Sequence, residues 1–172
     1  LLSAQFSVKV SNDWRALGSL DAVFTDATEA IKDGDYMEGS FGFAYRPENS
    51  DRLNALVKYT YLMDEPGQDQ VTIDGTKNGD AQRSHIFSAD VSYDVVPQLT
   101  VGAKYGFRIG ETRERVAGAD WERSEAHLGI VRADLHIVHE WDALLEGRMM
   151  WSPTTDQTDF GLLVALYKQM GD

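Results

Sequence analysis

The sequence predicts an all-β fold, an antiparallel up-and-down transmembrane β-barrel in which about nine strands are visible. Apolar and polar residues alternate with period two along most of the chain, which is typical of strands with two different faces. The alternating segments are close to the roughly ten residues with which a tilted strand crosses the hydrocarbon core of a bilayer. Short and long connections alternate between them. We expect residues 1–172 to form a single barrel domain.

The first four predicted strands cover 3–10, 14–25, 37–46 and 52–63. Each has an apolar residue at every second position, and polar or small residues at most of the positions between. Each segment is therefore expected to present one apolar face. The apolar series are Phe6 and Val8, then Leu20, Ala22 and Phe24, then Met37, Gly39, Phe41, Phe43 and Tyr45, and then Leu53, Ala55, Val57, Tyr59, Tyr61 and Met63.

The next two predicted strands cover 85–95 and 101–110, and the apolar residues of the second can be read with a helical or a strand period. In "VGAKYGFRIG" three glycines recur every four residues, which in an apolar helix would favour close helix packing. Period two instead gives one purely apolar face and leaves the glycines beside Lys104 and Arg108, where they make room or allow curvature. The apolar series are then Phe87, Ala89, Val91 and Tyr93, followed by Val101, Ala103, Tyr105, Phe107 and Ile109.

The last three predicted strands cover 125–138, 141–151 and 160–169. The third of them is mostly apolar, so alternation does not assign its faces. The other two keep the period of two, with the apolar series Val131, Ala133, Leu135 and Ile137, and then Trp141, Ala143, Leu145, Gly147, Met149 and Trp151.

Aromatic residues recur on the apolar faces. Trp141 and Trp151 lie ten residues apart on one face of the same strand. At about 3.3 Å per residue and a tilt of about 40°, they would be roughly 25 Å apart along the barrel axis, which is the spacing of the two aromatic girdles of a membrane barrel. The alternative is that they are core aromatics of a soluble sandwich. The predicted membrane-interface aromatics are Tyr45, Tyr59, Tyr61, Tyr93, Tyr105, Trp141 and Trp151.

Charged residues occupy the opposite faces in the middle of the strands. In lipid every backbone group must be bonded within the protein, so the sheet must close and turn its polar face inward. The signs are balanced, which favours an ion-pair network that fills a narrow barrel over a strongly selective pore. The predicted lumen-lining residues are Glu38, Lys58, Asp90, Asp94, Lys104, Arg108, Arg132, Asp134, Glu146 and Arg148.

Short and long connections alternate between the predicted strands. The short ones are "SND", "PENSD", "VPQ" and "HE", and the long ones are "DATEAIKDGDY", "DEPGQDQVTIDGTKNGDAQRS" and "ETRERVAGADWERS", while "PTTDQTD" is intermediate. In a meander, this order puts the short turns at one end and the long loops at the other. Outer-membrane barrels have this asymmetry, with short periplasmic turns and long extracellular loops.

The composition excludes several functions. A net charge of −12 argues against a nucleic-acid partner, because binding to phosphates needs a basic surface. The chain has no cysteine, which excludes disulfides and thiolate metal sites. It also lacks a phosphate-binding G-x-x-x-x-G-K-[ST] loop and any apolar run long enough for a membrane-spanning helix. We expect no cofactor and no metal.

The histidines are the remaining candidates for chemistry. Ser84 and His85 lie near the predicted loop-side rim, with His127 near the same rim, and outer-membrane barrel enzymes use such pairs. A nucleophile also needs a base within hydrogen-bonding reach and an orienting group, which the sequence does not supply. "HIVHE" at 136–140 lacks the spacing of a helical zinc motif. We therefore expect no catalytic residues, and a protein that is not an enzyme.

Three phrases carry a resemblance to a known group of proteins. "YRPENSDRLNALVKYTYL", "SADVSYDVVPQLTVGAKYGFRIGE" and "DALLEGR" resemble the β-barrel region at the C-terminal end of large Gram-negative surface and outer-membrane proteins. The resemblance spans roughly residues 37–172 and implies an architecture, not an activity. Such barrels usually end in one more hairpin with a terminal aromatic residue, whereas this chain ends in "KQMGD". The sheet is thus expected to be incomplete at its C-terminus, and the chain to be a piece of a longer one.

The first functional hypothesis is a membrane anchor in the bacterial outer membrane for a larger cell-surface protein. Its expected partners are the lipid bilayer and lipopolysaccharide, and further segments of the same polypeptide are a candidate third partner. One alternative is a small porin-like channel. The other is a soluble ligand-binding β-barrel, in which the apolar faces would point inward and the charged faces outward.

Overall fold

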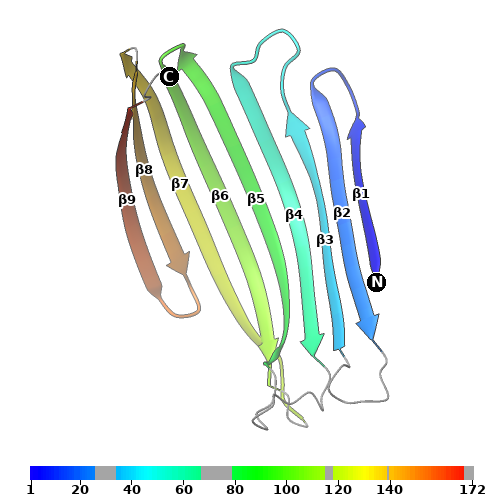
Figure 1. The fold of residues 1–172 in the computed structure, drawn as a ribbon. Coiled ribbons are helices and arrows are strands. Elements are labelled where there is room, and N and C mark those ends of the chain that lie inside the picture. The colour runs from blue at the N-terminus through cyan, green and yellow to red at the C-terminus, as the bar shows by residue number, and fades with distance from the viewer. Residues whose placement is uncertain (26–33, 67–78, 115–117, 139, 169–172) are drawn as a thin grey trace.

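The fold is a single antiparallel sheet of nine strands in the order β1-β2-β3-β4-β5-β6-β7-β8-β9 (Figure 1). This computed structural model describes residues 1–25, 34–66, 79–114, 118–138 and 140–168. The described residues contain no helix, and so none that could cross a membrane. The strands are β1 Leu2–Lys9, β2 Trp14–Thr25, β3 Gly34–Tyr45, β4 Leu53–Pro66, β5 Ala81–Val96, β6 Leu99–Arg113, β7 Glu122–Val138, β8 Trp141–Ser152 and β9 Gln157–Lys168.

The nine predicted strands are all present, and the prediction of an all-β up-and-down sheet is confirmed. The predicted uniform length of about ten residues is wrong for the central strands, because β5, β6 and β7 contain 16, 15 and 17 residues. Their ladders continue beyond the apolar stretch, as far as the partners Ala81↔Arg113 and Thr112↔Glu122. Apart from Ala81, the residues added at this end are polar on both faces, so alternation of apolar residues could not reveal them.

The connections separate by length, with one exception. The turns at 10–13, 46–52 and 97–98 and the start of β8 are at one end of the sheet, and the ends of β2, β4 and β6, where the longer connections begin, are at the other. The connection from β8 to β9 breaks the predicted alternation. It is a turn at 153–156 at the long-loop end, where Asp156 adopts a left-handed conformation with φ of 51°.

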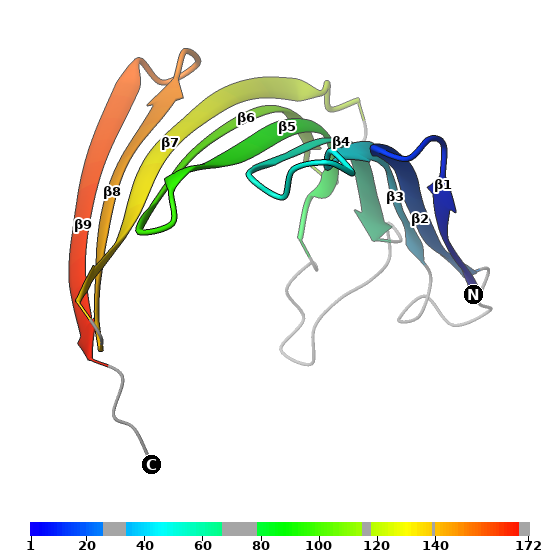
Figure 2. The ribbon, with the colours of Figure 1, turned by 90° about the horizontal axis from the view of Figure 1, so that it is seen from above.

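The sheet curves into an open arch, with β1 and β9 as its two edges (Figure 2). Its two faces follow from the pairing register. Phe41 pairs with Gly18 and with Tyr59, and Tyr59 pairs with Phe87, so the predicted apolar series share one face. The register is irregular between His136 and Val138, which removes Ile137 from the ladder with β8.

The handedness of L-residues shows which series of side chains points into the concave side of the arch. Figure 2 shows the sheet from above, and in it the arch opens toward the side from which Figure 1 is viewed. Figure 1 is therefore a view into the concave side of the arch. In a strand that runs upward, a residue whose side chain points at the viewer has its own N–H directed to the right. In β5 the N–H of Asp94 donates to the oxygen of Arg52, beside β4 on its right, and in β7 the N–H of His136 donates to Gln98, beside β6. The polar series therefore points into the arch, and the apolar series covers its convex outer face.

Gly18 joins the edge strand β1 to the rest of the sheet. The ring of Phe6 lies over Gly18, so that a Cβ on this glycine would lie 2.2 Å from Phe6 Cε1. The same ring reaches Phe41 on β3, with the two centroids 6.4 Å apart. A glycine covered by an aromatic ring from the neighbouring strand pins the register of the pair.

We predict that Gly18→Ala displaces the Phe6 ring and loosens β1, because the added methyl group overlaps the ring. The cost of such overpacking is about 1–3 kcal/mol. Amide hydrogen exchange of β1 should accelerate while β4 to β7 stay protected. Gly129→Ala is the control, since a Cβ there meets nothing within 4 Å. Equal protection of β1 in both variants would contradict the prediction.

Candidate functional site

The outer face of the arch is apolar and uncovered in this chain. Phe41, Tyr105 and Leu145 expose 45%, 46% and 51% of their surface, and Phe160 on the edge strand exposes 77%. The apolar series runs across every strand from β1 to β9. Soluble monomers seldom expose contiguous apolar patches larger than a few hundred Å². The face therefore needs an apolar environment or a partner.

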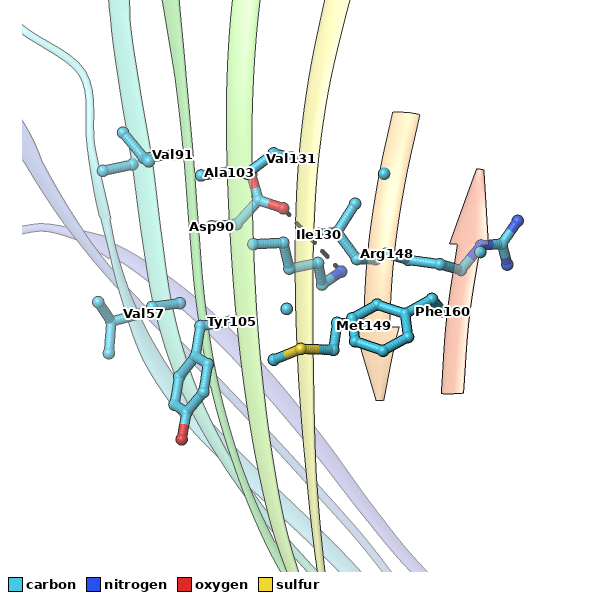
Figure 3. Close-up of a pocket in the computed structure, with 16 residues that line it drawn as sticks. Val57, Asp90, Val91, Ala103, Tyr105, Ile130, Val131, Arg148, Met149 and Phe160 are labelled. Atoms are coloured by element: carbon cyan, nitrogen blue, oxygen red, sulfur yellow. Dashed lines mark ion pairs between the residues drawn. The ribbon is translucent and has the colours of Figure 1, made fainter. Parts of the chain in front are cut away.

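A shallow depression of about 700 Å³ lies on this outer face, where small residues leave the backbone uncovered. Figure 3 views it from outside the arch, so the strand order is reversed relative to Figure 1. Its floor includes Gly129 and Gly147, and Tyr105, Met149 and Phe160 stand around it. The ion pair between Asp90 and Lys104 is drawn in the same view, but these side chains belong to the inner-face series.

All seven aromatic residues predicted at the membrane interfaces belong to the outer-face series: Tyr45, Tyr59, Tyr61, Tyr93, Tyr105, Trp141 and Trp151. Their heights differ. Tyr45, Tyr93 and Trp141 are close to the short turns, and Trp151 is close to the opposite end of β8. Tyr59, Tyr61 and Tyr105 lie further inside their strands, so they do not all belong to two narrow girdles.

Two tyrosines of the outer face are hydrogen-bonded to histidines in the same diagonal arrangement. The hydroxyl of Tyr59 is 2.7 Å from Nδ1 of His85, and the hydroxyl of Tyr105 is 2.8 Å from Nδ1 of His127. His127 also stacks on Trp151, with the centroids 4.9 Å apart. Each pair satisfies two polar groups on an otherwise apolar face. Sequence reasoning missed both pairs, because their partners are 26 and 22 residues apart along the chain.

The side chains of Ser84 and His85, considered above as a candidate pair, do not contact each other. Ser84 belongs to the inner-face series and accepts hydrogen bonds from Arg108, whereas His85 belongs to the outer-face series and contacts Tyr59. Adjacent residues of a strand point to opposite sides of the sheet, so these two side chains cannot meet. In "HIVHE", His136 is 2.6 Å from Asp142 through Nδ1, and residue 139 lies outside the described residues. The described part of the chain holds no cluster of three or more metal-binding side chains.

The ten residues predicted to line a lumen all belong to the inner-face series: Glu38, Lys58, Asp90, Asp94, Lys104, Arg108, Arg132, Asp134, Glu146 and Arg148. Most of them have a polar partner. The ion pairs are Arg132 Nε with Asp134 Oδ2 at 2.8 Å, Arg148 Nε with Glu146 Oε1 at 3.9 Å, and Lys104 Nζ with Asp90 Oδ2 at 4.0 Å. The hydrogen bonds are Tyr36 to Glu38 at 2.8 Å and Thr100 to Asp94 at 2.6 Å.

Glycines on the inner face give two long cations their space. A Cβ on Gly110 would lie 3.1 Å from Nη2 of Arg108, and a Cβ on Gly161 would lie 2.7 Å from Cγ of Arg148. The predicted role of the glycines in 101–110 therefore holds for Gly110. Gly102 and Gly106 lie away from the cations, since their added Cβ atoms would meet Val91 O and Leu128 Cβ.

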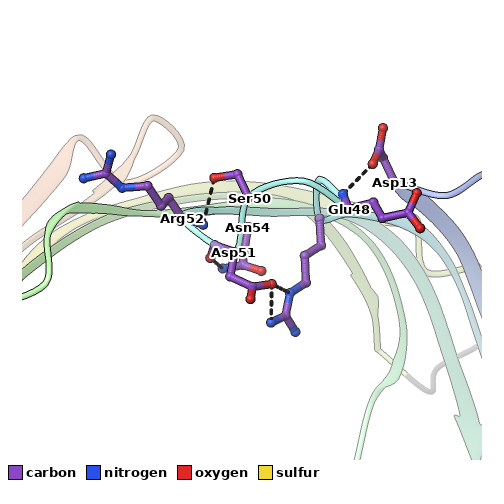
Figure 4. Close-up of polar contacts among 7 residues, drawn as sticks. Asp13, Glu48, Ser50, Asp51, Arg52 and Asn54 are labelled. Atoms are coloured by element: carbon purple, nitrogen blue, oxygen red, sulfur yellow. Dashed lines mark hydrogen bonds and ion pairs between the residues drawn. The ribbon is translucent and has the colours of Figure 1, made fainter.

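Polar contacts also link the short turns, which the sequence did not predict (Figure 4). The N–H of Glu48 donates to Asp13 Oδ1 at 2.6 Å, joining the turn at 46–52 to the turn before β2. Arg46 donates from Nε and Nη2 to Asp51 Oδ1, at 3.1 and 2.8 Å. Arg52 then reaches the oxygens of Asp94 and Val95 at the end of β5. These contacts therefore link the hairpins β1–β2, β3–β4 and β5–β6 at the short-turn end of the sheet.

These features define the class of protein as an open all-β meander with an apolar outer face and a charged inner face. No protein-family model matches the sequence, and a search of curated proteins finds no significant similarity.

We predict that Ser84→Ala destabilises the sheet, because Arg108 loses the hydroxyl that accepts from its Nε and Nη2 at 3.2 and 3.0 Å. Ser84 is only 2% exposed, so water cannot easily replace it. The expected loss in free energy of unfolding is about 1–3 kcal/mol, measured by urea titration with tryptophan fluorescence. Ser88→Ala is the matched control, on the same strand and face, with a longer 3.4 Å contact to Lys58 O. Equal effects of the two substitutions would rule out this role for Ser84.

Proposed function

We propose that the chain is part of a bacterial outer-membrane β-barrel that anchors a larger cell-surface protein, without enzymatic activity and without a cofactor. The observation that carries the proposal is the limited height of the apolar outer face. On β6 this face is apolar from Leu99 to Ile109 and then becomes ionic at Glu111. On β8 the apolar stretch runs from Trp141 to Trp151.

Each stretch contains eleven residues, and so ten steps from its first residue to its last. At about 3.4 Å per residue and a tilt of about 45°, this corresponds to roughly 24 Å along a barrel axis, close to the height of the apolar band of outer-membrane barrels. Strands β5 to β7 continue beyond this stretch at the long-loop end, and apart from Ala81 the residues of that extension are polar. A soluble core would have no reason to end at one height while the ladder continues.

A lipid environment also demands that the sheet edges be paired, because unpaired backbone groups are costly in hydrocarbon. β1 and β9 run in the same direction, because eight antiparallel pairings lie between them and eight is an even number of reversals. Direct pairing of the two edges would therefore be parallel. An antiparallel barrel needs an odd number of additional strands between them. We propose that further segments of the same polypeptide supply these strands.

The inner face favours an anchor over a channel. Its ten predicted residues comprise five acids and five bases, and three ion pairs join members of this set. A strongly selective pore would carry an excess of one sign. In a narrow barrel, such side chains fill the interior.

Flotation tests the membrane proposal. We expect the chain, refolded in the presence of vesicles of bacterial outer-membrane lipids, to float with them in a density gradient and to resist extraction with alkaline carbonate. Recovery of a folded monomer in buffer without detergent would contradict the proposal and favour the soluble barrel. Conductance across planar bilayers then separates the two membrane functions. An anchor gives no discrete current steps, whereas regular steps would favour the porin-like channel.

A further inference from the structure

A cluster of cations and one tryptophan lies on the outer face just beyond the apolar stretch, at the long-loop end. We call it the arginine cluster, and it consists of Arg83, Arg113, Arg123 and Trp121. Arg83, Glu111 and Arg123 are direct partners across β5, β6 and β7, and Ala81 pairs with Arg113 one step further along. All of these residues belong to the same face as Phe107 and Tyr105. The apolar outer face thus ends in an ionic row on three neighbouring strands.

Trp121 holds two of the guanidinium groups in place. The guanidinium carbons of Arg83 and Arg113 lie 4.2 and 4.6 Å from the centre of its ring. Ala81, only 4% exposed, is the partner of Arg113 at the start of β5. Stacking on an aromatic ring fixes the plane of a guanidinium while its edge donors stay available for hydrogen bonds.

The arginines keep donors for a further acceptor. Arg83 bonds to Glu111 through Nε, at 2.5 Å, and a guanidinium has five N–H donors. The closest atoms of Arg113 and Glu65 are 3.7 Å apart, which is longer than a hydrogen bond. The side chains of Arg83 and Arg113 are 35% and 37% exposed. Among the residues that the structure describes, most of the donors of both groups therefore have no acceptor.

We propose that the arginine cluster binds the phosphate of a phosphorylated lipid headgroup at the loop-side surface of the membrane. This inference rests on the proposed function, because it needs the apolar outer face to be in lipid. At that depth, the cluster lies where headgroups begin, and a tryptophan at this level is typical of the membrane interface. Arginine forks match phosphate oxygens in geometry and charge.

The nearby carboxylates make lipid phosphate a better ligand than a large polyanion. Glu65, Glu111 and Glu125 each lie next to one arginine, and the whole chain carries a net charge of −12. A nucleic acid or a polyanionic protein would meet repulsion over most of this surface. A lipid headgroup is already held beside the barrel by the bilayer. Hydrogen-bond donors directed at its phosphate are therefore sufficient to bind it.

The test compares a phosphorylated lipid with its dephosphorylated form. The refolded chain is placed in phosphatidylcholine vesicles that contain a trace of either lipid A or dephosphorylated lipid A, and the lipid retained by the protein is measured by native mass spectrometry. We expect the phosphorylated form to be retained about tenfold more strongly, because hydrogen bonds from a guanidinium to a phosphate are charge-assisted and stronger than those between neutral groups. Inorganic phosphate added at equal concentration should not displace it.

The variant Arg83→Gln/Arg113→Gln should lose this preference and still float with vesicles. Arg132→Gln is the matched control, because this arginine is also accessible and ion-paired but belongs to the inner face. Arg83→Lys/Arg113→Lys should keep part of the preference, since charge remains while the fork is lost. Flotation without any preference for phosphate, a preference that survives in the glutamine variant, or displacement by inorganic phosphate would each overturn the inference. Failure to float would overturn the proposed function instead.

Discussion

The constraint on which the rest of the structure depends is the period of two in a fully paired antiparallel ladder. Because each backbone group bonds to a neighbouring strand, the side chains are forced onto two faces with no exchange between them. Shifting one strand by one residue would move Lys104 and Arg108 to the outer face and Tyr105 and Phe107 to the inner one. The packing of Phe6 over Gly18 and the bonds from Arg108 to Ser84 are local contacts that hold this register.

Polar groups are satisfied in different ways on the two faces of the sheet. On the inner face, charges are satisfied by one another at short range, as with Arg132 and Asp134 at 2.8 Å. On the outer face, the polar groups of Tyr59 and Tyr105 are each satisfied by a histidine, so that they do not interrupt the apolar surface. The loop-side end of this surface is marked by the change from Ile109 to Glu111 on one strand. Length, curvature and polarity thus agree with a sheet built to separate lipid from a polar interior.

Period two was sufficient to predict eight of the nine strands and to place the predicted aromatic and charged residues on opposite faces, whereas the strand at 160–169 was predicted from its apolar run without its faces. The reason is that a side chain's face depends only on its position within the strand. Contacts that depend on register could not be predicted. His85 was considered with its chain neighbour Ser84, whereas its partner Tyr59 is 26 residues away. The polar extensions of β5 to β7 and the stacking of Arg83 on Trp121 carry no apolar signal at all. Closure of the sheet stays a prediction, because β1 and β9 are the edges of an open sheet in the described residues.

Tryptophan quenching by brominated lipids tests the orientation of the sheet most directly. In a chain whose four native tryptophans are replaced by phenylalanine, Leu144→Trp and Leu145→Trp put single probes on adjacent residues of β8 with opposite faces. Bromine atoms near the bilayer centre should quench the fluorescence of the probe at 145 and leave that of the probe at 144 nearly unchanged. Stronger quenching at 144 than at 145, or no quenching of either, would contradict an outer face in contact with lipid.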